Sequence, residues 1–177
     1  MQTTTIVLAT RNKGKIAELS SLLAPFNLQV LGLDSFPHVE EVEETGTTFV
    51  ENALLKACAV SKATGCVAIA DDSGIEVDYL NKAPGVYSAR YSATPTEPAT
   101  DERNLDKLLK TLRGVPMKER TGRFQCCMAA CAPDGATLVA EGAWEGKGLC
   151  WKGGVEKTVL ATTLCFLTRN AVARPPR

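Results

Sequence analysis

The first twenty-five residues combine a short apolar run, a polar loop and a helical pattern, and this order limits what the chain can fold into. Residues 4–10 are apolar and rich in β-branched side chains, which favours a strand. After Gly14, apolar residues recur at helical spacing, at Ile16, Leu19, Leu22 and Leu23. Pro25 closes that helix. The chain is therefore predicted to begin with a strand, a short loop and a helix.

Two further strands and a helix follow before residue 78. Residues 28–33 predict a strand, and the polar, acidic stretch 38–48 predicts a surface loop. Residues 49–63 predict a helix that Thr48 caps, with Glu51 completing a capping box. The next strand is expected at 66–70, and residues 74–77 are expected to continue it after a break.

The rest of the clear pattern predicts one helix and one hairpin. Leu105, Leu108, Leu109 and Leu112 form a stripe after a cap at Thr100 or Asp101, and the helix should end near Gly114. Residues 123–132 and 137–145 flank Pro133-Asp134-Gly135, which indicates a hairpin.

Composition limits the class of ligand. A chain of 177 residues with 45% hydrophobic side chains is long enough to bury one substantial core, and we expect a single domain. Twenty basic and twenty acidic residues leave no net charge to attract a nucleic-acid backbone. The balance favours a small anionic ligand over a polymer.

The apolar run at 6–9 is too short for a signal peptide or a membrane span, so no membrane association is expected and the predicted location is the cytoplasm. Seven cysteines include no C-x-x-C pair, and His38 is the one histidine. Zinc-ligand spacing is therefore absent, and free thiols are predicted.

Two segments carry the candidate chemistry. Thr10, Arg11, Asn12, Lys13, Gly14 and Lys15 join the first strand to the first helix, where free backbone N–H groups and lysines suit an anion. The alternative is a capped helix with solvated lysines. Asp71 and Asp72 follow an apolar run, where one carboxylate is expected to enter a cleft and the other to brace a turn.

Other candidates depend on these two segments. Glu43 and Glu44 lie in the acidic loop and either can supply a second oxygen ligand for Mg²⁺, although a solvated acidic face is the competing interpretation. Lys56 lies on the second helix, facing either solvent or cleft. Arg90 is a candidate phosphate clamp or a surface arginine packed on tyrosine.

Four ordered blocks resemble the inosine triphosphate pyrophosphatase family. They read I-V-L-A-T-R-N-K-G-K-I-A-E-L at 6–19, E-E-T-G-T-T-F-V-E-N-A-L-L-K-A at 43–57, A-I-A-D-D-S-G-I-E-V-D at 68–78 and A-P-G-V-Y-S-A-R-Y at 83–91. The resemblance covers about residues 4–145. It implies a two-lobed α/β fold with a mixed sheet and a central substrate cleft, and a homodimer.

The resemblance also implies an activity and its residues. The family uses Mg²⁺ to convert ITP, dITP or XTP to the monophosphate and pyrophosphate. Carried onto this sequence, residues 10–15 and Lys56 would hold the triphosphate, and Asp72 would be the general base and a metal ligand. Glu44 would be the second metal ligand. Ser73 would contact substrate, and Arg90 is a further carry-over.

The chain departs from the family after residue 145. The family has a glycine-rich F-G-Y-D-P motif and a later S-H-R motif that recognise the purine, and neither occurs in residues 146–177. Possible codons for the stretch from Gly153, read from the third base, yield G-G-K-N-G-F-G-Y-D-P-L-F-F-N-P-E. The present residues fix two of the three bases in every shifted codon and leave one free, so recovery of the missing motif is hard to attribute to chance. We therefore infer a frameshift between about Gly146 and Trp151.

Three activities follow as alternatives. The chain is predicted to be a pyrophosphatase of non-canonical purine nucleotides, with weak or no turnover because the base-binding motifs are missing. The second alternative is a catalytically decayed nucleotide-binding protein, and the third is a pyrophosphatase of modified pyrimidine nucleotides.

Overall fold

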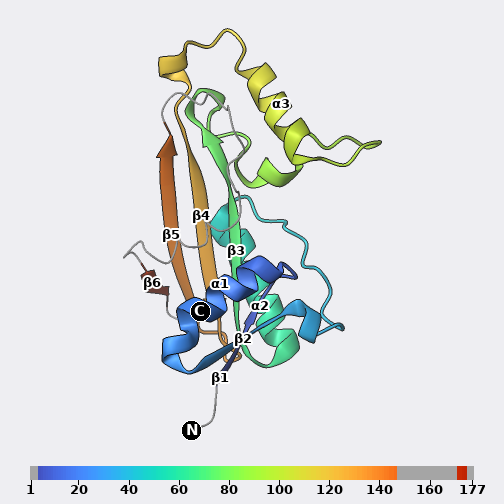
Figure 1. The fold of residues 1–177 in the computed structure, drawn as a ribbon, viewed down its shortest axis with the longest axis vertical. Helices are drawn as coiled ribbons and strands as arrows, with labels where there is room; N and C mark the ends of the chain where they lie inside the picture. The colour runs from blue at the N-terminus through green and yellow to red at the C-terminus, as the bar shows by residue number, and fades with distance from the viewer. Residues whose placement is uncertain (1–3, 147–170, 175–177) are drawn as a thin grey trace. The chain divides into compact units, whose positions relative to one another are not determined.

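The computed structural model describes residues 4–146 and 171–174 (Figure 1). Within them the strands form one six-stranded sheet of order β2-β1-β3-β4-β5-β6. Contacts divide the described chain into two compact units. The first holds residues 4–72, 126–142 and 171–174, and the second holds residues 73–125 and 143–146.

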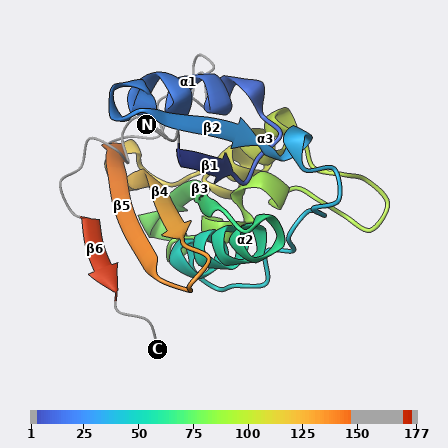
Figure 2. The same cartoon turned by 90° about the horizontal axis from the view of Figure 1, so that it is seen from below.

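The first unit is built on parallel strands. β1 (Thr4–Leu8) lies between β2 (Leu28–Gly32) and β3 (Val67–Val77), and it is parallel to both. Parallel neighbours need crossover connections, which α1 (Lys13–Leu23) and α2 (Phe49–Thr64) supply. Figure 2 shows these two helices on opposite faces of the strands.

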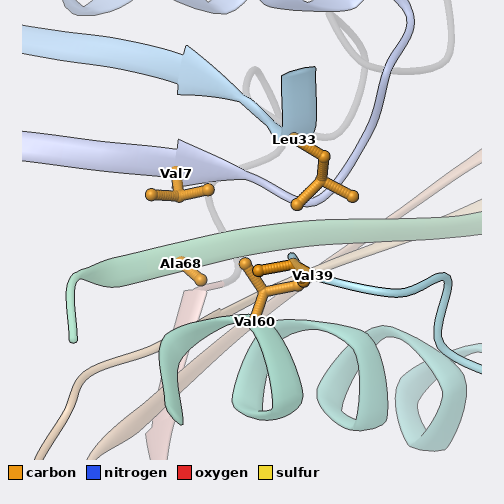
Figure 3. Packing of buried hydrophobic residues seen from close by; sticks show 5 residues of the cluster. All are labelled: Val7, Leu33, Val39, Val60 and Ala68. Atoms are coloured by element: carbon orange, nitrogen blue, oxygen red, sulfur yellow. The ribbon is translucent and has the colours of Figure 1, made fainter. Parts of the chain in front are cut away.

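Alternating side chains of the strands fill a core on each face. On the face toward α2, Val7 and Ala68 pack with Val60, Leu33 and Val39 (Figure 3). On the face toward α1, the packed residues are Leu8, Leu19 and Val30, with Ile16, Leu23 and Ile69 beside them. Each face of β3 therefore packs against a different helix. Asp71 and Asp72 are adjacent in the chain, so their side chains point toward different helices.

The start of α2 is capped as the sequence predicts. The Thr48 hydroxyl accepts the Glu51 N–H, and the Glu51 carboxylate accepts the Thr48 N–H, so the capping box is complete. Hydrogen bonds from Thr47, and then from Thr48, lower the pKa of Glu51. α2 ends at Gly65, whose φ of 67° is the left-handed conformation that suits glycine.

The predicted break after residue 70 is wrong. β3 continues from Val67 to Val77, so Asp71 and Asp72 lie inside a strand and not at its end. The reason is that each carboxylate finds a partner on its own face of the strand, as described below. Gly74 keeps the strand tight against Ser88, since a Cβ at Gly74 would come within 2.4 Å of the Ser88 Oγ.

The second unit packs a helix on the later part of β3. α3 (Asp101–Thr111) is capped by Thr100, as predicted, and buries Leu108 and Leu112 against Val77 and Val115. Three short 3-10 helices complete the unit, at Asp78–Leu80, Gly85–Arg90 and Met117–Glu119. Two more short 3-10 helices belong to the first unit, at Ala24–Phe26 and Leu33–Ser35.

The predicted hairpin is confirmed. β4 (Gly122–Cys131) and β5 (Thr137–Gly146) are neighbours in the sheet and are joined through Gly135, whose φ is 88°. β6 (Ala171–Arg174) pairs antiparallel with β5 over residues 137–140.

Most of the predicted aberrant tail, residues 147–170 and 175–177, lies outside the described residues. The single domain over residues 1–177 therefore stays a prediction. No helix in the described part of the chain is long and apolar enough to span a membrane. The cysteines that the structure describes are free thiols, as expected.

Candidate active site

Asp72 is a buried carboxylate held by two residues of α2. Its side chain lies on the α2 face of β3, and the residue is 7% exposed. Asn52 Nδ2 donates a hydrogen bond to Asp72 Oδ2 at 3.0 Å. Lys56 Nζ lies 3.8 Å from Asp72 Oδ1. A buried charge is stable only when it is paired and hydrogen-bonded, and Asn52 and Lys56 supply both.

Lys56 also binds the acidic loop. Its Nζ donates to Glu44 Oε1 at 2.7 Å, so one ammonium group serves two carboxylates. The side chain of Lys56 is 17% exposed and that of Glu44 is 27% exposed. Lys56 therefore faces these acids and not open solvent, which settles the orientation that the sequence left open. We call Glu44, Asn52, Lys56 and Asp72 the carboxylate site.

The two glutamates of the acidic loop differ in position. Glu44 is half-buried and reaches Lys56, whereas the neighbouring Glu43 is exposed. The geometry thus favours Glu44 as the second acid of the site.

Asp71 lies on the opposite face of β3 and has a separate partner. Lys15 Nζ of α1 donates to Asp71 Oδ2 at 2.6 Å, with both side chains largely buried. Adjacent residues of a strand point to opposite faces, so the two aspartates are divided between two helices. The two aspartates point in opposite directions, as expected, but Asp71 binds a helix residue and does not brace a turn.

The loop after β1 is a capped helix start. The Asn12 side chain accepts hydrogen bonds from the N–H groups of Gly14 at 2.9 Å and Lys15 at 3.3 Å. Its own N–H donates to the Thr10 Oγ1 at 3.2 Å. These amide groups, expected to be free for an anion, are therefore already bonded within the loop, and Lys13 is an exposed cation beside them.

Arg11 is directed toward the segment after β2. Its guanidinium donates to the carbonyl groups of Leu33 and Val39, and it pairs with Asp34 at 3.3 Å. These contacts give Arg11 a role in anchoring the chain around residues 33–39.

Ser73 and Arg90 belong to the second unit. Ser73 follows Asp72 in β3 and is half-buried. The Arg90 guanidinium stacks over the Tyr87 ring, 5.2 Å from its centroid, which is the tyrosine-packed arrangement that the sequence left as one of two alternatives.

Asn52 is the member of the site that sequence reasoning missed. It is fully buried, and it lies one helical turn before Lys56 on α2. A polar residue one turn from a lysine, inside the predicted apolar face of a helix, was the available signal.

The donor set suits a hard divalent cation together with phosphate. Mg²⁺ is commonly held by one or two carboxylates and by substrate phosphates, and Glu44 and Asp72 are two such carboxylates close to one lysine. No group of three or more His, Cys, Asp or Glu side chains suited to a metal occurs in residues 4–146 and 171–174.

The fold and the site together define an α/β protein in which one lysine lies between two carboxylates. The chain belongs to the Ham1 family, which matches residues 6–153. This match confirms the family resemblance of the four sequence blocks.

Individual relatives are similar to this chain in sequence and in structure. The chain is 64% identical over 149 residues to a dITP/XTP pyrophosphatase of Nitratidesulfovibrio vulgaris, covering 82% of this chain and 72% of the relative. A dITP/XTP pyrophosphatase of Photobacterium profundum is 51% identical, with 80% and 71% covered. A solved HAM1 protein from Coxiella burnetii superposes with a TM-score of 0.74 at 40% identity, covering 81% of this chain and 72% of that one.

Proposed function

We propose that this chain hydrolyses non-canonical purine nucleoside triphosphates, namely ITP, dITP and XTP, to the monophosphate and pyrophosphate. The observation that carries the proposal is the carboxylate site, in which Lys56 lies between Glu44 and the buried Asp72. The relatives named dITP/XTP pyrophosphatase support the substrate class.

The proposed reaction is attack of water on the α-phosphorus. Asp72 accepts a proton from the attacking water, and Asn52 keeps the carboxylate oriented while it does so. The bond between the α-phosphorus and the bridging oxygen breaks, and pyrophosphate leaves with that oxygen. Water is the nucleophile throughout, so no side chain forms a covalent bond.

Lysines balance the charge of the triphosphate. Lys56 and Lys15 are both held by carboxylates, and Lys13 is exposed at the start of α1. Cations near the departing pyrophosphate stabilise the charge that develops on it. We infer that Thr10, Asn12 and Gly14 line the same phosphate site, while Arg11 supports the loop from behind.

Mg²⁺ is the proposed cofactor, with Glu44 and Asp72 as its ligands from the protein. When bound, it would acidify the attacking water and neutralise phosphate charge. Ser73 and Arg90 are further proposed substrate contacts.

Base recognition is proposed to be impaired in this chain. The Ham1 match ends at residue 153, and the F-G-Y-D-P and S-H-R motifs are absent from the sequence. Without them the site keeps its acids and lysines but lacks groups for the purine. Weak turnover is the expected result, and a catalytically decayed nucleotide-binding protein is the second candidate.

Other parts of the proposal concern the setting of the enzyme. We propose a cytoplasmic homodimer that binds neither nucleic acid nor membranes. Equal numbers of basic and acidic residues support the absence of a polyanionic partner.

The direct test is product analysis in water enriched in oxygen-18, with ITP and Mg²⁺. The proposal predicts inosine monophosphate carrying the label and unlabelled pyrophosphate. Label in inorganic phosphate, with a nucleoside diphosphate as the other product, would show attack at the γ-phosphorus and overturn it. If ITP raises the melting temperature without turnover, the decayed binding protein is the correct reading.

A further inference from the structure

Asn52 is buried in a position where only a fully bonded amide is stable. It is 0% exposed, and a buried amide that lacks hydrogen-bond partners destabilises the folded state. Both ends of this amide are used. Nδ2 donates to Asp72 Oδ2 at 3.0 Å, and Oδ1 accepts the Gly46 N–H at 2.7 Å.

The partners determine which way the amide faces. The Gly46 N–H can only donate, so it must meet the oxygen, and the Asp72 carboxylate accepts from the nitrogen. A reversed amide would place two donors together at Gly46 and two acceptors together at Asp72. Asn52 thus links the acidic loop to β3, and its amide group can take only one of its two flipped orientations.

The connection lies beside both acids of the carboxylate site. Gly46 is two residues after Glu44, and Asp72 is the other acid. The loop also approaches Asn52 closely, because a Cβ at Gly46 would lie 2.6 Å from Asn52 Oδ1. Lys56 joins the same two acids by charge, but a flexible ammonium fixes direction poorly.

We propose that Asn52 is a positioning residue that sets the separation and orientation of the Glu44 and Asp72 carboxylates, so that together they bind a divalent cation. This inference rests on the proposed function for its chemistry, but it makes a claim about cation binding that does not need turnover. Residues that orient metal ligands typically change metal affinity by about 10–100-fold when they are replaced.

The test measures binding of Mn²⁺, a paramagnetic substitute for Mg²⁺, to the full chain without nucleotide, by the signal of the free ion. Asn52→Leu removes both hydrogen bonds with little change in size. Asn52→Asp keeps an acceptor for Gly46 and loses the donor to Asp72. Gly46→Ala pushes the loop away from Asn52 and leaves the Asp72 side intact. Each variant should bind Mn²⁺ about 10–100-fold more weakly than the unchanged chain.

Ser61→Ala is the matched control. Ser61 is on the same helix, is 1% exposed, and donates one hydrogen bond to the Cys66 carbonyl at 2.8 Å. Its loss should lower the melting temperature and leave Mn²⁺ affinity within about twofold, since it touches neither acid. A general effect of weakening α2 would instead appear in this control as well.

Outcomes separate this inference from the proposed function. Folded Asn52 and Gly46 variants that bind Mn²⁺ as the unchanged chain does would overturn the positioning role, and so would a lack of Mn²⁺ binding by the unchanged chain. If Asn52→Leu does not fold, Gly46→Ala decides alone. Asn52-dependent Mn²⁺ binding without ITP hydrolysis would retain the positioning role and reject the proposed function. Where turnover is measurable, kcat should fall while KM for ITP changes by less than about threefold.

Discussion

Two clusters of acids in this protein use their cations differently. In the carboxylate site, Lys56 serves Glu44 and Asp72 together, at 2.7 Å and 3.8 Å. In a second group, which we call the arginine cluster, Arg123 serves Glu76, Asp78 and Glu145. Each of these acids receives its own N–H group, at 3.3 Å, 2.9 Å and 2.8 Å respectively.

This difference separates acids that a guanidinium holds in fixed directions from acids that share one lysine. The arginine cluster joins side chains of three strands and the following turn, and the planar guanidinium holds them in fixed directions. Its bonds to Glu145 first, and then to Asp78, raise the pKa of Arg123. Lysine is a compact charge on a flexible stem, and we propose that Lys56 turns from a carboxylate to a phosphate when a ligand binds at the carboxylate site.

The largest expected effect comes from removing the charge of Asp72. Asp72→Asn should lower pyrophosphate release from ITP by about 10³-fold, because it removes the proton acceptor. The comparison variant is Asp78→Asn, which removes an acid of the arginine cluster and should leave kcat unchanged. Steady-state assays of both variants check this, and an equal loss of activity in the two would remove the distinction between the clusters.

Exchanging the cation gives the next largest effect. Lys56→Arg would place the cation of the arginine cluster in the carboxylate site, where a rigid fork should bind Glu44 and Asp72 too firmly. We expect a loss of about 10²-fold in kcat, with the melting temperature unchanged or raised. A variant that retains full activity would show that the type of cation is unimportant.

Breaking the arginine cluster should affect stability alone. Arg123→Met leaves three acids without their shared cation, and it should lower the melting temperature by about 2–4 °C. Differential scanning calorimetry measures the shift. The cluster is solvent-exposed in part, so 1 M salt should reduce the difference. A change in kcat for this variant would contradict the assignment of a purely structural role.

The smallest effect concerns acid stability. The Thr121 hydroxyl first, and then Arg123, lower the pKa of Asp78. A carboxyl whose pKa is lower in the folded state contributes stability above its unfolded pKa of about 4, and this contribution is lost as the pH falls through the folded pKa. Thr121→Val should therefore be less stable than the unchanged chain at pH 7, and the difference in stability should be smaller at pH 2. Urea unfolding at the two pH values measures this difference in the free energy of unfolding. A difference that is larger in acid would contradict the prediction.

Much of the fold was predictable because the signals are local. The strand and helix at 4–23, the capping box at Thr48 and the hairpin around Gly135 each depend on residues close in sequence. The continuation of β3 through Asp71 and Asp72 was not predictable. Two adjacent acids look like the end of a strand until Lys15 and Lys56, on opposite helices, supply their partners.

The candidate site was predictable in its charges but not in its arrangement. Family resemblance indicated Asp72, Lys56 and Glu44, and the structure brings these three together. It could not indicate that Asn12 occupies the N–H groups of the first helix, or that Arg11 turns toward residues 33–39. Asn52 was missed because the role of a buried amide depends on its hydrogen-bond partners, and the sequence does not show which residues these are.

The most direct test of the central claim is Mg²⁺-dependent pyrophosphate release from ITP, XTP and GTP. It should compare this chain, a form whose tail is restored to the inferred reading frame, and the restored form carrying Asp72→Asn. We predict that the restored form hydrolyses ITP and XTP in preference to GTP, that this chain is much slower, and that Asp72→Asn lowers release by about 10³-fold. Folded proteins that release no pyrophosphate in any form, or an Asp72→Asn variant that keeps its rate, would contradict the account.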